Sequence, residues 1–180
     1  MKRASLIVGL LVLIGLWCGP LAGLTTHSFA AHMTLHMGVV AVGAPLIAVG
    51  LAGGRFDPVR ARPDWFPPIP LSMIELVVVW TWHAPAVHHF ARGAAHGFVA
   101  EQASFFVAGM WVWLSAIGGD VTHRQTRAGP GVVALLLTSM HMTLLGALLA
   151  LTPEQMREVA LFFATLPASS SDGTKEERAQ

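Results

Sequence analysis

The stretch "AHMTLHM" (31–37) places two histidines and two methionines four residues apart. In a helix, side chains four residues apart lie close together, so His32 neighbours His36 and Met33 neighbours Met37. At about 100° per residue these four positions cover an arc of roughly 140°. Imidazole nitrogen binds copper in either oxidation state, whereas thioether sulfur selects Cu(I). The spacing therefore predicts a His/Met face with an affinity for copper.

The elements that carry these residues are expected to be transmembrane helices. Of the 180 residues, 54% are apolar and only 12% are charged, about half the charged share of soluble proteins. A net charge of +1 predicts no nucleic-acid partner, and a single cysteine excludes an internal disulfide. We expect an all-α fold, a polytopic bundle surrounded by membrane lipids. Five apolar stretches approach the roughly 20 residues that a bilayer requires, at 5–24, 32–51, 71–91, 98–119 and 131–151.

The two ends of the chain differ in composition. The first span, 5–24, follows "MKR", and its one candidate cleavage site near Ala22 is weak, so we expect an uncleaved signal anchor. Residues 1–166 are expected to form the bundle. Residues 167–180 are polar and rich in serine, which predicts a disordered tail.

Arginine and lysine residues are distributed unevenly over the short segments between spans. Positive residues in such segments mark the cytoplasmic side. With the N-terminus inside, the outer loops between spans contain only Arg92. The inner segments then contain Lys2, Arg3, Arg55, Arg60, Arg62, Arg124 and Arg127. The predicted topology is N-in and C-out.

On this topology, eight of the nine histidines fall on the outer half, and only His123 is cytoplasmic. His36, His83 and His141 lie on three different spans at overlapping depths. Ionisable groups inside a membrane are costly and indicate function by default, which favours a shared metal site. The alternative is that each imidazole is a satisfied donor in the packed bundle. His88 and His89 are expected to be hydrated loop residues.

Two polar residues near the outer end of the fourth span, Glu101 and Gln102, are candidates for orienting a ligand imidazole. Glu75 in the third span is expected either to extend toward the membrane surface or to bond to a neighbouring helix.

The chain resembles the CtaG family of polytopic membrane proteins associated with cytochrome c oxidase assembly. The stretches that resemble it are "HMTLHMGVVAVGAPLIAVG" (32–50), "WTWHAPAVHHFARGAAHGFVAEQASFFVAGMWVWL" (80–114) and "HMTLLGALLALTPEQM" (141–156). The resemblance implies a multi-pass protein of the bacterial plasma (inner) membrane that helps to mature a haem–copper oxidase, most plausibly by handling copper at the outer face. It implies no enzymatic activity. Its partners would be oxidase subunits, with a copper chaperone as a further candidate.

Position by position, the resemblance gives five matching histidines: His32, His36, His83, His96 and His141. With Met33 and Met37 they form the predicted metal-binding set, and Cu(I) is the expected ion. This chain departs from the family at Gln102, where a histidine is expected after the glutamate. It also has five predicted spans rather than about seven.

Two other functions remain open. A haem b protein would use axial histidines from two helices, for example His36 with His141 or His83. A metal or proton transporter would need polar groups that continue to the cytoplasmic side, where Glu75 is the main candidate.

The predicted topology can be tested with reporter fusions. A reporter fused after Gln180 should be extracytoplasmic, and one fused near Arg60 should be cytoplasmic, because the basic loops stay inside. Paired alkaline phosphatase and fluorescent protein fusions measure this. Finding both positions on the same side would contradict the topology.

Overall fold

The computed structural model describes residues 2–84, 86–87, 90–91, 95–151, 156–157 and 161. His88, His89 and the predicted tail 167–180 lie outside these residues. Within them the chain is helical and contains no strand, which confirms the predicted all-α membrane bundle. The chain divides into two compact units, Met1–Met142 and Thr143–Gln180. The elements that form the bundle are α1 (Lys2–Cys18), α2 (Pro20–Leu24), α3 (Phe29–Met37), η1 (Gly38–Gly43), α4 (Ala44–Leu51), α6 (Pro68–His83), α8 (Ala95–Ile117) and α9 (Val121–Ala150).

Four stretches of helix are long and apolar enough to cross a membrane: Lys2–Leu24, Phe29–Leu51, Ala95–Ile117 and Arg124–Ala150. The third predicted span, 71–91, corresponds to α6, whose 16 residues extend about 24 Å at 1.5 Å per residue. This is less than the hydrocarbon thickness of roughly 30 Å. The helix ends at His83 because Ala84 precedes Pro85 and is extended, with ψ 135°. His83 therefore lies at the C-terminal end of α6.

Two other helices differ from the predicted spans. The first bends where Gly19 is extended, with ψ 176°, before Pro20 starts α2. The last, α9, begins at Val121 and continues through Pro130, whereas the predicted span starts at 131. Polar residues precede Pro130, so hydropathy does not detect these first turns of the helix. The helix continues through Pro130 because one proline removes only one hydrogen bond.

A π-helical segment, η1, joins α3 to α4. The Ala44 N–H donates to the Val39 carbonyl, five residues back. The same spacing would pair residue 45 with the Val40 carbonyl, but Pro45 has no N–H. The Trp113 Nε1–H group on α8 donates to that carbonyl instead, at 3.0 Å. A side chain of α8 therefore satisfies the backbone group that the proline leaves unpaired.

Close helix packing around this segment depends on small residues. A Cβ atom on Gly9 of α1 would lie 2.7 Å from Ile47 Cγ1, and one on Gly50 of α4 would lie 2.7 Å from Leu6 Cβ. Glycine at both positions lets the two backbones approach, as in other membrane helix pairs. α8 packs against α4, η1 and α6, which brings α3, α6 and α8 together in one unit.

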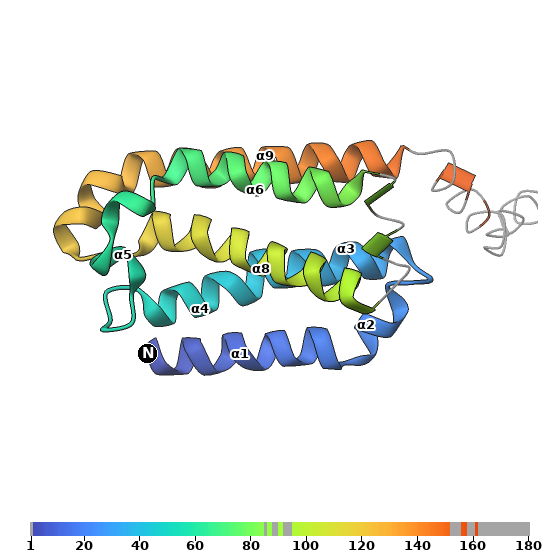
Figure 1. The fold of residues 1–180 in the computed structure, drawn as a ribbon, viewed down its shortest axis with the longest axis horizontal. Coiled ribbons are helices and arrows are strands. Elements are labelled where there is room, and N and C mark those ends of the chain that lie inside the picture. Colours follow the sequence, from blue (N-terminus) through green and yellow to red (C-terminus); the bar gives the residue numbers. More distant parts are fainter. Residues whose placement is uncertain are drawn as a thin grey trace, which may run out of the picture. The chain divides into compact units, whose positions relative to one another are not determined.

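Basic residues lie beside backbone carbonyls at the end of the bundle that holds the N-terminus. Lys2 Nζ donates to Ala52 O at 2.6 Å, and Arg127 donates to Pro63 O. The buried Asp57 carboxylate accepts from three backbone N–H groups there, those of Gly53, Val59 and Gly119. Figure 1 shows α1 starting and α5 (Pro58–Ala61) lying at this end, while α2 and the start of α8 lie at the other. The basic residues predicted to face the cytoplasm therefore include a group that shares one end.

Replacing Trp113 with phenylalanine should destabilise the fold, because the Val40 carbonyl would lose its donor inside the bundle. An unpaired buried polar group costs about 1–3 kcal/mol, so the thermal transition of the purified protein should fall. Trp111 lies on the same helix and is 42% exposed, so Trp111→Phe is the matched control. Equal transitions for the two variants would contradict a role for the indole N–H.

Candidate functional site

Three histidines from two helices meet at the end of the bundle opposite Asp57. His32 and His36 lie one turn apart on α3, and His83 is the last residue of α6. The His83 ring centroid is 5.7 Å from that of His32 and 5.6 Å from that of His36. His32 is 3% exposed and His36 is 1% exposed. The structure therefore brings together three of the predicted site residues, and they are largely shielded from water.

The hydrogen bond of His83 determines which of its ring nitrogens is available. His83 Nδ1 lies 2.7 Å from the Val79 carbonyl oxygen. A carbonyl oxygen only accepts, so Nδ1 must be the donor. Its Nε2 atom is buried and has no hydrogen-bond partner among the described residues. In the neutral ring, Nε2 then has a free lone pair, the form in which an imidazole binds a metal.

His36 is the most completely buried member of the cluster. Neither of its ring nitrogens has a hydrogen-bond partner within the described part of the chain. The Phe105 ring of α8 packs against it, with centroids 4.1 Å apart. Buried polar groups are nearly always paired, and an unpaired one costs free energy. Within the described residues His36 therefore lacks the hydrogen bond that the alternative interpretation requires, and its two ring nitrogens are candidate ligand atoms.

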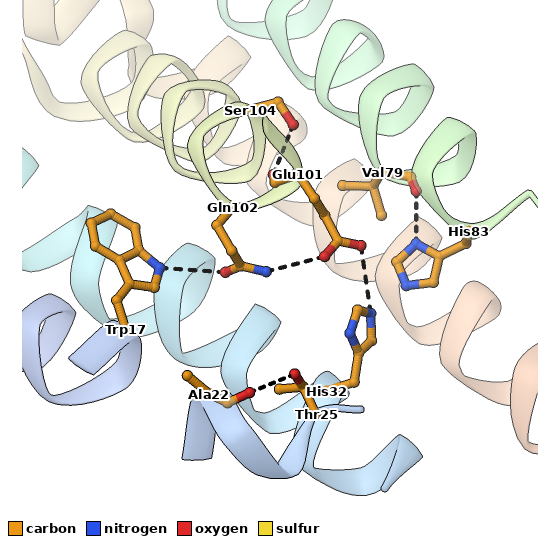
Figure 2. A network of polar contacts seen from close by, with 9 residues as sticks. All are labelled: Trp17, Ala22, Thr25, His32, Val79, His83, Glu101, Gln102 and Ser104. Carbon is orange, nitrogen blue, oxygen red and sulfur yellow. Dashed lines mark hydrogen bonds and ion pairs between the residues drawn. The ribbon is translucent and has the colours of Figure 1, made fainter. Parts of the chain in front are cut away.

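A polar network from α8 and α1 reaches His32 (Figure 2). Glu101 Oε1 lies 4.0 Å from His32 Nε2 in an ion-pair contact, and both side chains are buried. Gln102 Nε2 donates to Glu101 Oε2 at 3.4 Å, and Trp17 Nε1 donates to Gln102 Oε1 at 3.4 Å. Gln102, at the position where the family resemblance predicts a histidine, therefore connects α1 to the glutamate beside His32.

The fourth buried histidine, His141 of α9, lies beside a second buried glutamate. Its Nε2 atom is 3.9 Å from Glu75 Oε2, which also accepts the Thr138 hydroxyl at 2.6 Å. Glu75 is 1% exposed and lies at the middle of α6. Of the two alternatives for Glu75, bonding to a neighbouring helix is correct.

The remaining predicted ligands lie apart from these four histidines. Met33 and Met37 line a shallow surface groove with Thr34, Gly38, Ala41 and Val42, and Met37 is 39% exposed. None of the histidines lines that groove. His96 is exposed near the start of α8, where its ring contacts Phe90. Helix α3 therefore carries its histidines and its methionines in different surroundings instead of on one joint face.

A cavity of about 250 Å³ opens beside His32 and Glu101. It is lined by Ala22, Thr25, Thr26, His32, Ala91, Ala95, Phe98 and Glu101. Within the described ranges, no three His, Cys, Asp or Glu side chains are already arranged to hold one metal ion. Any ion bound here would require the rings to rotate toward it.

The sequence predicted the histidines as site residues but did not predict that Glu75 lies beside one of them. The signal was available, because a carboxylate in an apolar helix must find a polar partner. Which partner it finds depends on the register between α6 and α9, which hydropathy does not determine.

Comparison with known proteins gives one match. The family model described as cytochrome c oxidase caa3 assembly factor (Caa3_CtaG) matches residues 1–171. No curated protein and no solved structure matches the chain. The match includes every helix of the histidine cluster and nearly the whole sequence. The chain therefore belongs to the Caa3_CtaG family of cytochrome c oxidase assembly factors.

Proposed function

We propose that this protein delivers copper to a haem–copper oxidase during its assembly, at the outer face of a bacterial plasma membrane. Membership of the family supports the assembly role. The copper cargo is supported by the chemistry of the buried side chains. The partners are then oxidase subunits, and a copper chaperone would supply the ion.

The observation that carries this proposal is His36. Its two ring nitrogens are unpartnered among the described residues, although it is 1% exposed in an apolar bundle. His83 adds a second free nitrogen 5.6 Å away, measured between ring centroids. Imidazole is a good copper ligand, and bound metal would offset the desolvation of both rings.

The arrangement suits transient binding. The three nearest imidazoles come from two helices and are not yet arranged around one point. A carrier must release its cargo, and a site that forms only when rings rotate releases the ion more readily than a rigid one. We therefore expect reversible copper binding rather than a resident cofactor.

The two methionines form a second, softer donor group. Met33 and Met37 lie one turn apart in a surface groove. Thioether sulfur selects Cu(I), so this groove is the proposed place where reduced copper first meets the protein.

The haem alternative is less well supported. Bis-histidine ligation requires two rings with a macrocycle-wide slot between them, but Phe105 packs against both His36 and His83. A visible absorbance scan of the purified protein distinguishes the two, because haem would add an intense Soret band.

One observation favours the transporter alternative, and another disfavours it. Glu75 and His141 extend the polar groups to the middle of α6. Closer to the basic end, the buried Ser72 and Ser115 hydroxyls donate to carbonyls of their own helices. The remaining buried carboxylate of the described residues, that of Asp57 at the basic end, is taken up by three backbone N–H groups. This favours a carrier over a path across the membrane.

His36→Leu should abolish oxidase maturation in the host membrane and reduce the copper bound by the purified protein. It should leave the thermal transition unchanged or slightly higher, because the substitution removes a buried polar group that has no partner. Oxidase activity, bound copper and thermal stability are measured together.

His27→Leu is the matched control, since His27 is exposed. If His36→Leu instead lowered the stability and left oxidase activity intact, His36 would have a packing role and the proposal would fail.

Replacing both Met33 and Met37 with leucine should weaken Cu(I) binding about tenfold, which corresponds to about 1.4 kcal/mol. The side-chain volumes are similar, so insertion and packing should be preserved. Competition against a Cu(I) chelator under anaerobic conditions measures the affinity. Met140→Leu, at an exposed position of α9, is the control. Unchanged affinity in the double variant would remove the groove from the proposal.

A further inference from the structure

The cavity beside His32 and Glu101 combines features that the copper proposal alone does not explain. It is about 250 Å³ in volume, and its polar lining includes a buried imidazole and a buried carboxylate, His32 and Glu101. The remaining lining consists of threonine hydroxyls and apolar side chains. A space of this size admits a small hydrated ion, and its charged lining makes a cation the favoured occupant.

We propose that this cavity is a Cu(II) site in which His32, Glu101 and His83 are the ligands, separate from the methionine groove. This inference rests on the proposed function for the choice of copper. Its donors are nitrogen and oxygen only. Such donors suit Cu(II), which prefers mixed imidazole and carboxylate ligation, whereas Cu(I) prefers the sulfur that this cavity lacks among its described lining.

Two of the donors, His32 and Glu101, line the cavity within reach of one ion, and the His83 ring lies beside His32 outside that lining. Glu101 Oε1 and His32 Nε2 are 4.0 Å apart, so an ion between them could bind both at ordinary coordination distances of about 2 Å. The His32 and His83 centroids are 5.7 Å apart. Figure 2 shows the Glu101 carboxylate beside the His32 ring of α3, and the His83 ring at the end of α6. A rotation of the His83 ring about its side-chain bonds would bring its free Nε2 atom to the ion.

Hydrogen bonds outside the cavity support two of these ligands. The Val79 carbonyl accepts from His83 Nδ1 and leaves Nε2 for the metal. Gln102 donates to Glu101 Oε2, and Trp17 donates to Gln102, so α1 fixes the carboxylate. Such second partners orient metal ligands, and their loss typically lowers metal affinity by about 10–100-fold. The network of Figure 2 thus has the form expected around a metal ligand.

The experiment measures Cu(II) affinity of the full-length protein in detergent by competition with a chelator, together with electron paramagnetic resonance of the bound ion. Cu(II) alone is the probe. Glu101→Gln keeps the shape of the side chain but removes its charge, and it should weaken binding by at least about tenfold. Asp120→Asn, at an exposed acidic residue just before α9, is the control and should have little effect. The spectrum of the wild type should show nitrogen hyperfine coupling.

A second variant tests the cavity without changing a ligand. Ala22 lines it, so Ala22→Leu should occupy part of the space and weaken Cu(II) binding while leaving Cu(I) binding unchanged. If the wild type binds no Cu(II), or if Glu101→Gln and Asp120→Asn bind it equally well, the inference is overturned.

Oxidase activity in the host separates this inference from the proposed function. If Glu101→Gln loses Cu(II) affinity but the oxidase still matures, the site is supported and its role in assembly fails. If His36→Leu prevents maturation while Glu101→Gln leaves Cu(II) affinity unchanged, the proposed function survives and the Cu(II) site is overturned.

Discussion

The free-energy cost of a polar atom inside an apolar helix bundle governs the rest of this structure. Water cannot reach the interior to pair such an atom, so each one needs a partner from the chain itself. Most find one. The Val40 carbonyl, left without a donor by Pro45, accepts from Trp113. Asp57 accepts from three backbone N–H groups. Within the described part of the chain, several buried polar atoms have no hydrogen-bond partner, and both ring nitrogens of His36 and the Nε2 atom of His83 are among them.

The same cost explains why the buried glutamates lie where they do. A carboxylate within the bundle requires a donor or a cation, and each of the two has a histidine within 4.0 Å. Glu101 approaches His32 from α8, and Glu75 approaches His141 from α6. Each carboxylate therefore pairs with an imidazole from another helix, and these helices are held together partly by polar contacts that a ligand would share.

Hydropathy predicted the bundle well, because long apolar stretches have few alternatives to a membrane helix. It failed at proline and glycine, where local backbone geometry decides. Gly19 and Pro20 break the first span, and Ala84 before Pro85 ends α6. Pro130, by contrast, lies inside α9. The same residue type thus ends one helix and is tolerated in another, and the sequence pattern does not distinguish these outcomes.

For the site, helical spacing correctly placed His32 and His36 on one face of the helix and was too coarse for the methionines. His32 and His36 are four residues apart and both are buried, whereas Met33 and Met37 are each displaced by one residue, about 100° around the helix. An arc of 140° is wide enough to include the neighbouring helices and also the outer surface. The packing of α3 against its neighbours, which no single helix reveals, determines which part of the arc is buried.

This separation matters for how copper would be handled. Sulfur donors lie in a surface groove, while nitrogen and carboxylate donors lie inside, beside a cavity at the end opposite the basic residues. Glu75, in the middle of α6, is the member of this group nearest the basic end, and the Asp57 carboxylate beyond it is taken up by three backbone N–H groups. The shortest way for an ion bound in this group to leave the protein is then through the cavity beside His32 and Glu101. Under the proposed function, an oxidase subunit that receives copper must therefore approach the end of the bundle where α2 and the start of α8 lie.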